Sequence, residues 1–404
     1  TGTAQLGGAL VYVLAPGNYT PETGSFLTTS GGFTGSFSSV TTQMQAGQAP
    51  ASGSATVQAF DPSGSLFFRL GSSFTVAPAD AALFADTNQT MAIYAERSSD
   101  VLLGHAMDTS AAPCPATGAM QSGGSTQAGI ARVLAAAFCS ARGWVEASGT
   151  RMDVASGYGA QSAGFLAGVD RPVSAVGTRL GLAVGYDEIA LTDKAGGTAG
   201  TDTVRIGLYG SQPLGRFILS GDVMDGFAAI STMRATGAGD AAGHASGNVV
   251  SGGLRITRRL TFAGVSFLPA AGVQAANVST GAFDETARQT AFVVGTAASG
   301  GTSLRPYIKL AISRSFVTAS RLVVTPQISL GVDDEAGDPG RAVRMTANGV
   351  AFSAAATRLD ATAGRIGAGI AASRNNILLL ARYTALVSGN WSSQTVEAQL
   401  QLKF

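Results

Sequence analysis

TVEAQLQLKF, residues 395–404, ends the chain with a strict alternation of polar and apolar side chains. One face of this segment carries Val396, Ala398, Leu400, Leu402 and Phe404, and the other carries Thr395, Glu397, Gln399, Gln401 and Lys403. Hydrophobicity with a period of two is typical of a β-strand whose one face meets a core or lipid. The segment therefore predicts a strand with one fully apolar side.

The same alternation recurs from residue 143 onward. Leu180, Leu182 and Val184, for example, alternate with Arg179 and Ala183. The pattern predicts about 12 antiparallel strands, near residues 143–153, 160–173, 178–191, 202–213, 216–231, 246–259, 261–280, 288–313, 321–335, 360–373, 376–388 and 391–404. An even number of strands suits a bacterial barrel, which closes its sheet without a free edge.

The amino-acid composition limits the classes of protein to which these strands can belong. Charged residues make up only 13% of the 404 residues, about half the share of a typical soluble domain, and the mean hydropathy is +0.24. No uncharged apolar run is long enough for a spanning helix. An apolar chain without such a helix is either a large soluble β protein or a transmembrane β-barrel.

The predicted connections favour the barrel. On one side they are very short, at residues 174–177, 214–215, about Leu260, 317–320 and 374–375. On the other side they are longer and polar, at residues 194–200, 236–245, 281–287 and about 336–359. Tight turns on one side and long loops on the other are typical of outer-membrane barrels.

One long helix is predicted before the strands, over residues 78–107. Pro78 suits a first helical turn, and Asp80 suits the positive end of the helix dipole. About thirty residues would reach roughly 45 Å, more than the ~30 Å hydrocarbon core of a bilayer. The helix is too polar for lipid, but a polar pore would accept it.

Residues 1–76 have a third pattern. Short strand-like runs alternate with turns such as Pro16-Gly17-Asn18, and Gly, Ser and Thr are abundant. Short strands separated by turns at this spacing predict the end of a β-solenoid.

Several segments, in order along the chain, resemble the autotransporter family. The first three strands of its barrel resemble GWVEASG (143–149), GVDRP (168–172) and TRLGLAVGY (178–186), and residues 303–305 and Phe404 also fit. The last turns of its passenger β-helix resemble APGNYT (15–20) and GGFTGSF (31–37). Residues 108–142 depart from the family, because its usual link between helix and barrel is shorter.

The resemblance implies four parts: residues 1–76 as the end of the passenger β-helix with an autochaperone-like role, 77–108 as a pore-plugging linker helix, 109–142 as a connecting segment, and 143–404 as an outer-membrane β-barrel translocator. It implies type V secretion, with the passenger end at the bacterial cell surface. The expected partners are outer-membrane lipid, the barrel-assembly machinery and the chain's own passenger. We expect the barrel to be monomeric.

Strand parity predicts which charged side chains face the lumen. The set is mainly basic: Glu146, Arg179, Arg205, Asp222, Arg255, Lys309, Arg365, Arg382 and Glu397. The helix offers Asp86, Asn88, Glu96, Arg97 and Asp100 as contacts. Opposite charges would hold the helix through partly desolvated pairs. Hydration of a water-filled lumen explains any one of these residues equally well, so only the matched set favours a plug.

The resemblance also places an assembly signal in the last strand, at Leu400, Leu402 and Phe404. An alternating strand with a terminal aromatic can add to an exposed sheet edge by main-chain pairing. A lipid-facing position in the interfacial girdle is the alternative role for Phe404.

Catalytic chemistry has little support. GxSxG, HExxH, Walker and GxGxxG motifs are absent, so no enzyme activity, catalytic residue or cofactor is expected. A net charge of +1 without a basic block makes nucleic acid an improbable partner. Cys114, Cys139 and two histidines do not have the spacing of a zinc site. The cysteines would form one disulfide in an exported chain or remain two buried thiols.

Three functions remain in view. The first is a translocator and surface anchor. The second is a gated diffusion channel, which would have no reason for a helix and solenoid turns before the barrel. The third is a surface adhesin or enzyme whose active passenger is missing from this chain, and it is compatible with the first.

Overall fold

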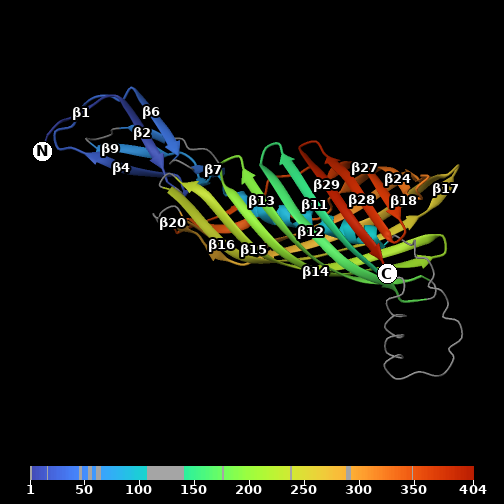
Figure 1. The fold of residues 1–404 in the computed structure, drawn as a ribbon. Helices are drawn as coiled ribbons and strands as arrows, with labels where there is room; N and C mark the ends of the chain where they lie inside the picture. Colours follow the sequence, from blue (N-terminus) through green and yellow to red (C-terminus); the bar gives the residue numbers. More distant parts are fainter. Residues whose placement is uncertain are drawn as a thin grey trace, which may run out of the picture.

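The computed structural model describes residues 2–15, 17–44, 48–52, 57–60, 65–106, 141–174, 177–236, 239–287, 293–347 and 349–404. It is an elongated molecule in which a barrel surrounds one helix and a group of short strands lies beyond one end (Figure 1). No described helix is both long and apolar enough to cross a membrane. The predicted Cys114–Cys139 pair and nearly all of segment 109–142 lie outside the described residues.

Twelve antiparallel strands close the barrel, as the sequence predicts. They are β11 (Arg142–Val154), β12 (Tyr158–Pro172), β13 (Arg179–Asp193), β14 (Thr198–Leu214), β15 (Phe217–Thr236), β16 (Gly239–Arg258), β18 (Val265–Thr280), β22 (Ser299–Arg314), β24 (Val323–Asp334), β27 (Thr362–Arg374), β28 (Ile377–Val387) and β29 (Trp391–Lys403). The sheet closes where β29 pairs with β11, from Trp391–Val154 to Lys403–Arg142.

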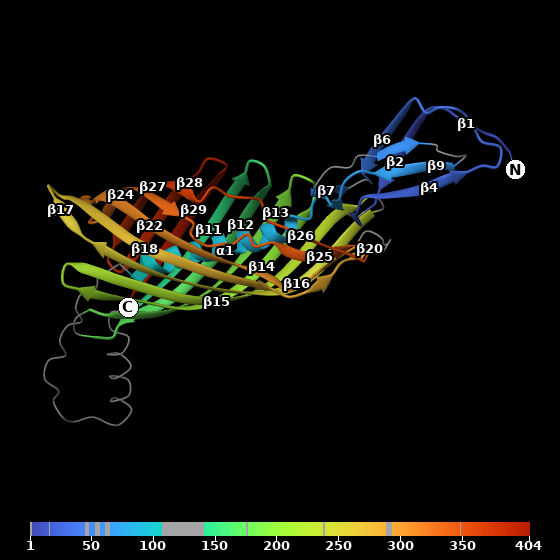
Figure 2. The ribbon, with the colours of Figure 1, turned by 180° about the vertical axis from the view of Figure 1, so that it is seen from behind.

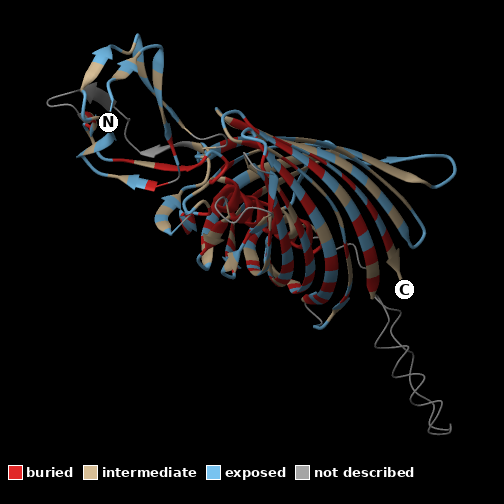
Figure 3. Cartoon of the chain, turned by 90° about the vertical axis from the view of Figure 1, so that its left-hand side faces the viewer, coloured by how far each residue is buried: buried red, intermediate tan, exposed pale blue. Residues whose placement is uncertain are grey.

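Alternation along each strand separates an apolar outside from a polar inside. On β14, Val204 and Ile206 are 60% and 56% exposed, whereas Thr203 and Arg205, which alternate with them, are buried. The striped pattern runs around the barrel (Figure 3). The exposed apolar side chains form the surface that meets lipid, because a barrel in a bilayer is apolar outside and polar inside.

Helix α1 (Leu83–Ala106) runs along the inside of the barrel (Figures 1 and 2). Its 24 residues span roughly 36 Å at 1.5 Å per residue. It begins five residues later than predicted, because Pro78 ends strand β10 (Phe74–Pro78), where it pairs with Gln48. Residues 79–82 form a turn, so Asp80 lies before the helix rather than in its first turn.

Two predicted connections lie elsewhere or are shorter in the structure. The turn expected at about Leu260 lies at Ala263 and Gly264, whose φ angles of 49° and 76° are left-handed. It joins β17 (Leu260–Phe262) to β18, which divides the predicted strand 261–280. The predicted loop 236–245 belongs largely to β16, because β15 and β16 stay paired as far as Thr236–Gly239. The small residues of this segment weaken the strand pattern in sequence but do not prevent pairing.

The long connections contain strands of their own. A side sheet is built in the order β19 (Phe283–Asp284), β21 (Val294–Thr296), β25 (Val343–Ala347) and β26 (Val350–Ala354). Two short strands, β20 (Thr286–Ala287) and β23 (Phe316–Val317), pair with β16 and β24. The predicted strand 288–313 is thus shorter: β22 begins at Ser299, and Val294 packs in the side sheet. The predicted loops 281–287 and 336–359 are partly strand, so the contrast in loop length is weaker than expected.

The side sheet covers the beginning of α1. Phe84 and Ala85 pack with Val294, Val343 and Met345 in one buried apolar cluster. The chain leaves the barrel wall at these connections because the N-terminal turn of the helix presents apolar side chains that need a cover.

Ten short strands precede the helix. They are β1 (Ala4–Leu6), β2 (Ala9–Leu14), β3 (Gly17–Tyr19), β4 (Glu22–Thr28), β5 (Phe33–Gly35), β6 (Ser39–Met44), β7 (Gln48–Ser52), β8 (Val57–Phe60), β9 (Ser65–Leu70) and β10. Strands β1–β5 and β2–β6 pair in parallel, as successive turns of a solenoid do. The other groups, β4–β9–β8 and β3–β10–β7, are antiparallel, and β7 lies next to the barrel (Figure 1).

Candidate functional site

The lumen of the barrel is filled by α1. Of the helix's 24 residues, 20 are buried, polar and apolar alike. Burial on every side is expected for a helix that is surrounded by a wall rather than packed on one face. The cavities found beside Tyr94, Arg97 and Asp100 have volumes of about 50 and 30 Å³. Such cavities hold only a few water molecules.

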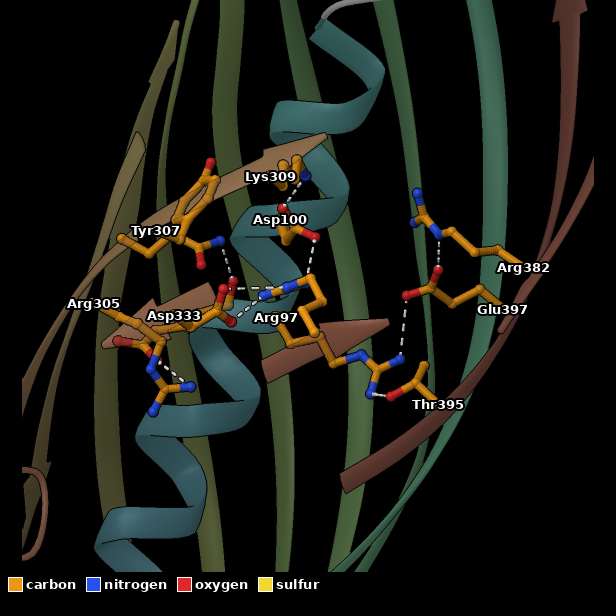
Figure 4. Close-up of polar contacts among 12 residues, drawn as sticks. Arg97, Asp100, Arg305, Tyr307, Lys309, Asp333, Arg382, Thr395 and Glu397 are labelled. Atoms are coloured by element: carbon orange, nitrogen blue, oxygen red, sulfur yellow. Dashed lines mark hydrogen bonds and ion pairs between the residues drawn. The ribbon is translucent and has the colours of Figure 1, made fainter. Parts of the chain in front are cut away.

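Asp100 lies at the centre of the largest group of charges. Lys309 Nζ lies 3.0 Å and Arg365 Nη1 3.3 Å from its carboxylate oxygens, and Arg255 also forms an ion pair with it. The three cations come from β22, β27 and β16, so one carboxylate on the helix joins three separate strands. Figure 4 shows Lys309 above Asp100 and the helix running between the strands.

Glu96 lies one helical turn before Asp100 and also contacts the wall. Ser303 donates a hydrogen bond to its carboxylate, and Arg305 Nη1 lies 3.4 Å from it. Arg305 also pairs with Glu335 at 3.1 Å. The backbone carbonyl of Glu96 accepts a hydrogen bond from Gln274 at 2.8 Å. Both the side chain and the backbone of this turn are therefore held by β18 and β22.

At Arg97 the charges are the other way round: the helix supplies the cation and the barrel wall supplies the carboxylate. Its guanidinium lies 3.2 Å from Glu397 and donates hydrogen bonds to Thr150 and Thr395. Glu397 also accepts from Arg382 (Figure 4). Thr150 belongs to β11 and Thr395 to β29, so Arg97 bridges the first and last strands of the barrel.

Further contacts hold the beginning of α1. The carboxylate of Asp86 accepts hydrogen bonds from the backbone N–H and the hydroxyl of Thr357, at 2.6 and 3.0 Å. Asn88 accepts a hydrogen bond from Thr280 at 2.7 Å and donates one to Ser299 at 3.0 Å. Asp86 and Asn88 are thus fixed by neutral partners, without a barrel cation.

Asp80, in the turn before the helix, forms a buried ion pair. Its carboxylate lies 2.7 Å from Arg234, which also lies 2.6 Å from Glu285. Burial raises the pKa of the Asp80 carboxyl above its usual value, although the nearby Arg234 guanidinium lowers it. Glu285 lies next to the short strand β20, so this pair ties the helix entrance to a connection of the barrel.

The end of α1 rests on an aromatic contact. The His105 ring stacks on Trp144 with centroids 3.7 Å apart, and its Nε2 lies 3.6 Å from Glu146. The backbone carbonyl of His105 accepts a hydrogen bond from Arg142 at 3.3 Å. A cation at the C-terminal end of a helix stabilises the exposed carbonyls and opposes the dipole.

Two glycines make room for the aromatic side chains at this end. A Cβ on Gly181 would lie 2.4 Å from Tyr209, and one on Gly168 would lie 2.7 Å from Trp144. Tyr209 accepts a hydrogen bond from the Trp144 indole at 2.6 Å. The alternation along β11 would have placed Trp144 on the lumen face with Glu146. No pattern in the sequence shows which glycines lie against the Trp144 ring.

Not every predicted lumen residue contacts the helix. Arg179 pairs with Asp170, and Arg205 lies 2.5 Å from Asp187, both on the barrel itself. Among the described residues Asp222 forms no ion pair, but it contacts the helix by accepting a hydrogen bond from Ser99 at 2.7 Å. Arginines that face the lumen without touching α1 are neutralised by neighbouring strands.

The last strand places its terminal residue at the seam. The backbone N–H of Phe404 donates to the carbonyl of Ala141 at 3.0 Å, and its side chain is 67% exposed. Leu400 is also exposed, whereas Leu402 is half-buried. The described residues contain no group of three or more side chains that could hold a metal ion.

A family model described as the autotransporter beta-domain matches residues 143–384, more than half of the chain. No curated protein matches the sequence. The chain is similar to the translocator domain of the autotransporter NalP from Neisseria meningitidis, at 16% identity and a TM-score of 0.53, over 69% of this chain and 94% of that one.

A second solved structure is similar to the same extent. It is the beta domain of the Bordetella autotransporter Brka, at 18% identity and a TM-score of 0.54, over 66% of this chain and 100% of that one. At sequence identities this low, the similarity shows a shared fold and nothing further.

The Asp100 cluster gives a first prediction. In the Asp100→Asn variant, Arg255, Lys309 and Arg365 keep their charges but lose the carboxylate that they share. Breaking a buried pair in this way costs about 3–5 kcal/mol, so the free energy of unfolding in lipid vesicles, measured with urea, should fall by that amount. Ser98→Ala is the matched control, because the only hydrogen bond of the Ser98 hydroxyl among the described residues is to the Tyr94 carbonyl in its own helix. Equal stability of the two variants would contradict the role of Asp100.

Proposed function

Because this chain belongs to the autotransporter β-domain family, and is therefore an outer-membrane translocator, we propose that α1 plugs its pore and that residues 1–76 are the last part of its passenger. The observation that carries the plug is the Asp100 cluster, in which the helix is bound to three strands at once. A helix bound so firmly, with cavities of only about 50 and 30 Å³ beside Tyr94 and Arg97, closes the route that the passenger once used.

The course of the chain supports the passenger proposal. Strands β1–β10 lie at the end of the barrel where α1 begins, and the C-terminus lies at the opposite end (Figure 2). The chain therefore runs through the pore between β10 and β11. A bacterial barrel with an even number of strands leaves both of its ends on the periplasmic side. The N-terminal strands then lie at the cell surface, where a translocated passenger belongs.

A gated diffusion channel is not favoured. Such a channel needs a lumen that opens by a modest movement, whereas α1 contacts the wall at both ends and at its centre. An adhesin or enzyme activity would belong to the passenger, and it adds to translocation rather than replacing it.

The last strand fits an assembly role. We propose that Leu400, Leu402 and Phe404 are recognised by the barrel-assembly machinery before β29 pairs with β11. Phe404 stays exposed in the finished barrel and packs beside Gly143, where a Cβ would lie 3.2 Å from its ring. An aromatic ring that contributes little to the folded barrel is free to serve recognition.

Conductance across planar bilayers tests the plug. The full chain should give small or no currents, and deletion of residues 83–106 should give large stable currents, because the lumen is then empty. Deletion of residues 9–60, which leaves α1 in place, should keep the pore closed. Large currents from the full chain that do not change on deletion of the helix would refute the plug.

Protease treatment of intact cells tests the passenger proposal. Leu14 is buried in a small apolar cluster with Leu70, Phe74 and Val76, whereas the adjacent Val13 is 63% exposed. Leu14→Asp buries a charge without a partner, so it should make the surface-exposed passenger protease-sensitive while the barrel stays resistant. Val13→Asp should leave the passenger resistant. A resistant passenger in the Leu14→Asp variant would show that these strands do not support its folding.

The assembly role is tested by Phe404→Ala against Phe316→Ala, which removes another exposed aromatic side chain from β23. The amount of folded barrel in the outer membrane, measured by heat-modifiable mobility on gels, should fall several-fold only for Phe404→Ala. If both variants assemble equally well, Phe404 is a lipid-facing residue without a signal role.

A further inference from the structure

The outer face of the barrel is not uniform, because a groove of about 630 Å³ runs along β18. Its floor is Pro269 and Ala271, whose short side chains face outward on this strand. The paired residues on either side are larger: Ile256 lies opposite Ala271 on β16, and Ile308 lies opposite it on β22. Leu310 is likewise opposite Pro269. Small residues between two rows of large ones produce an apolar channel on the lipid-facing surface.

One end of this groove carries positive charge. Arg258 lines it, pairs with Phe217 across β15–β16, and places its guanidinium 5.7 Å from the centre of that ring. The chain neighbours of this pair are also cationic: Arg216 lies in the turn before β15, and Arg259 directly follows β16. Arg216 and Arg259 are exposed. No ion pair joins these three arginines to an acidic side chain among the residues that the structure describes.

Among the residues that the structure describes, the exposed charged side chains in the turns and strand ends at this end of the barrel have one sign. Its turns and strand ends carry Arg171, Arg216, Arg258, Arg259, Arg314, Arg321 and Arg374. The acidic residue nearest to them in the chain, Asp170, is buried in the lumen with Arg142 and Arg179. Exposed acidic residues such as Asp153 and Asp334 lie at the opposite ends of their strands. An exposed anion would therefore be attracted more strongly to this rim than to the opposite one, where exposed cations such as Arg151 and Lys194 lie among acidic residues.

We propose that this groove is the binding site of an anionic glycerophospholipid, with one acyl chain along Pro269 and Ala271 and the headgroup phosphate on Arg216, Arg258 and Arg259. The groove is lined by the first part of β18, and the hairpin β17–β18 lies at the barrel end that also holds the C-terminus (Figures 1 and 2). With the C-terminus on the periplasmic side, the lipid belongs to the inner leaflet.

The two parts of the site act on different parts of the lipid. Guanidinium groups bind phosphate through paired, charge-assisted hydrogen bonds, and they are attracted to anionic headgroups at a membrane surface. The channel over Pro269 and Ala271 accepts methylene groups whatever the headgroup is. The arginines should therefore set the preference for negative charge, and the groove should set how long any lipid is retained.

Native mass spectrometry of the full chain released from detergent micelles tests this division. The protein is offered equal amounts of phosphatidylglycerol and phosphatidylcholine with identical acyl chains, and the lipids retained on each barrel are counted. The wild-type chain should retain phosphatidylglycerol in excess. Arg258→Gln should reduce that preference about fivefold, the effect of one cation at a lipid surface, and the triple variant R216Q/R258Q/R259Q should abolish it.

Two matched controls separate a site from general surface charge and shape. Arg374→Gln removes an exposed cation from another turn of the same rim, and Ala381→Leu enlarges an exposed alanine on β28 away from the groove. Neither should change retention. Ala271→Leu fills the groove and should lower the retention of both lipids. Equal retention of the two lipids by the wild type, an unchanged preference in the triple variant, or the same loss with Arg374→Gln would each overturn the proposal.

Discussion

The pairing of β29 with β11 is the constraint on which the rest of this molecule depends. It removes the last free edge of the sheet, and it turns one face of every strand into the wall of a closed lumen. Charges on that wall are cut off from bulk water and need partners nearby. The wall and α1 supply them to each other, as at Asp100 and Arg97, and the wall supplies its own at Arg179 and Arg205.

Much of the barrel could be predicted from sequence because its pattern is local. A period of two needs only a few residues to be visible, and the last strand was predicted at 391–404 against the observed Trp391–Lys403. Parity along a strand also indicates which charged residues face inward. Glycine- and alanine-rich segments such as 236–245 carry no such signal, although their backbones pair as well as any other.

What could not be predicted depends on pairing between distant residues. The start of α1 is set by the pairing of Pro78, the last residue of β10, with Gln48 of β7 and by the side sheet that covers Phe84, and neither is encoded near the helix. The choice of Lys309 rather than Arg179 as a partner of Asp100 depends on strand order and shear. The stack of His105 on Trp144 likewise requires the end of the helix to reach β11 at one particular level.

Arg97 has a consequence for the order of events during biogenesis. Its partners, Thr150 on β11 and Thr395 and Glu397 on β29, come from opposite ends of the barrel sequence. They become neighbours only when the first and last strands pair. In a partly assembled barrel the Arg97 guanidinium therefore lacks some of its hydrogen-bond and ion-pair partners. A passenger still in transit would occupy the same space. The Arg97 contacts therefore form only in the closed barrel whose passenger has left the lumen. Once formed, they stabilise the helix in the lumen against moving back.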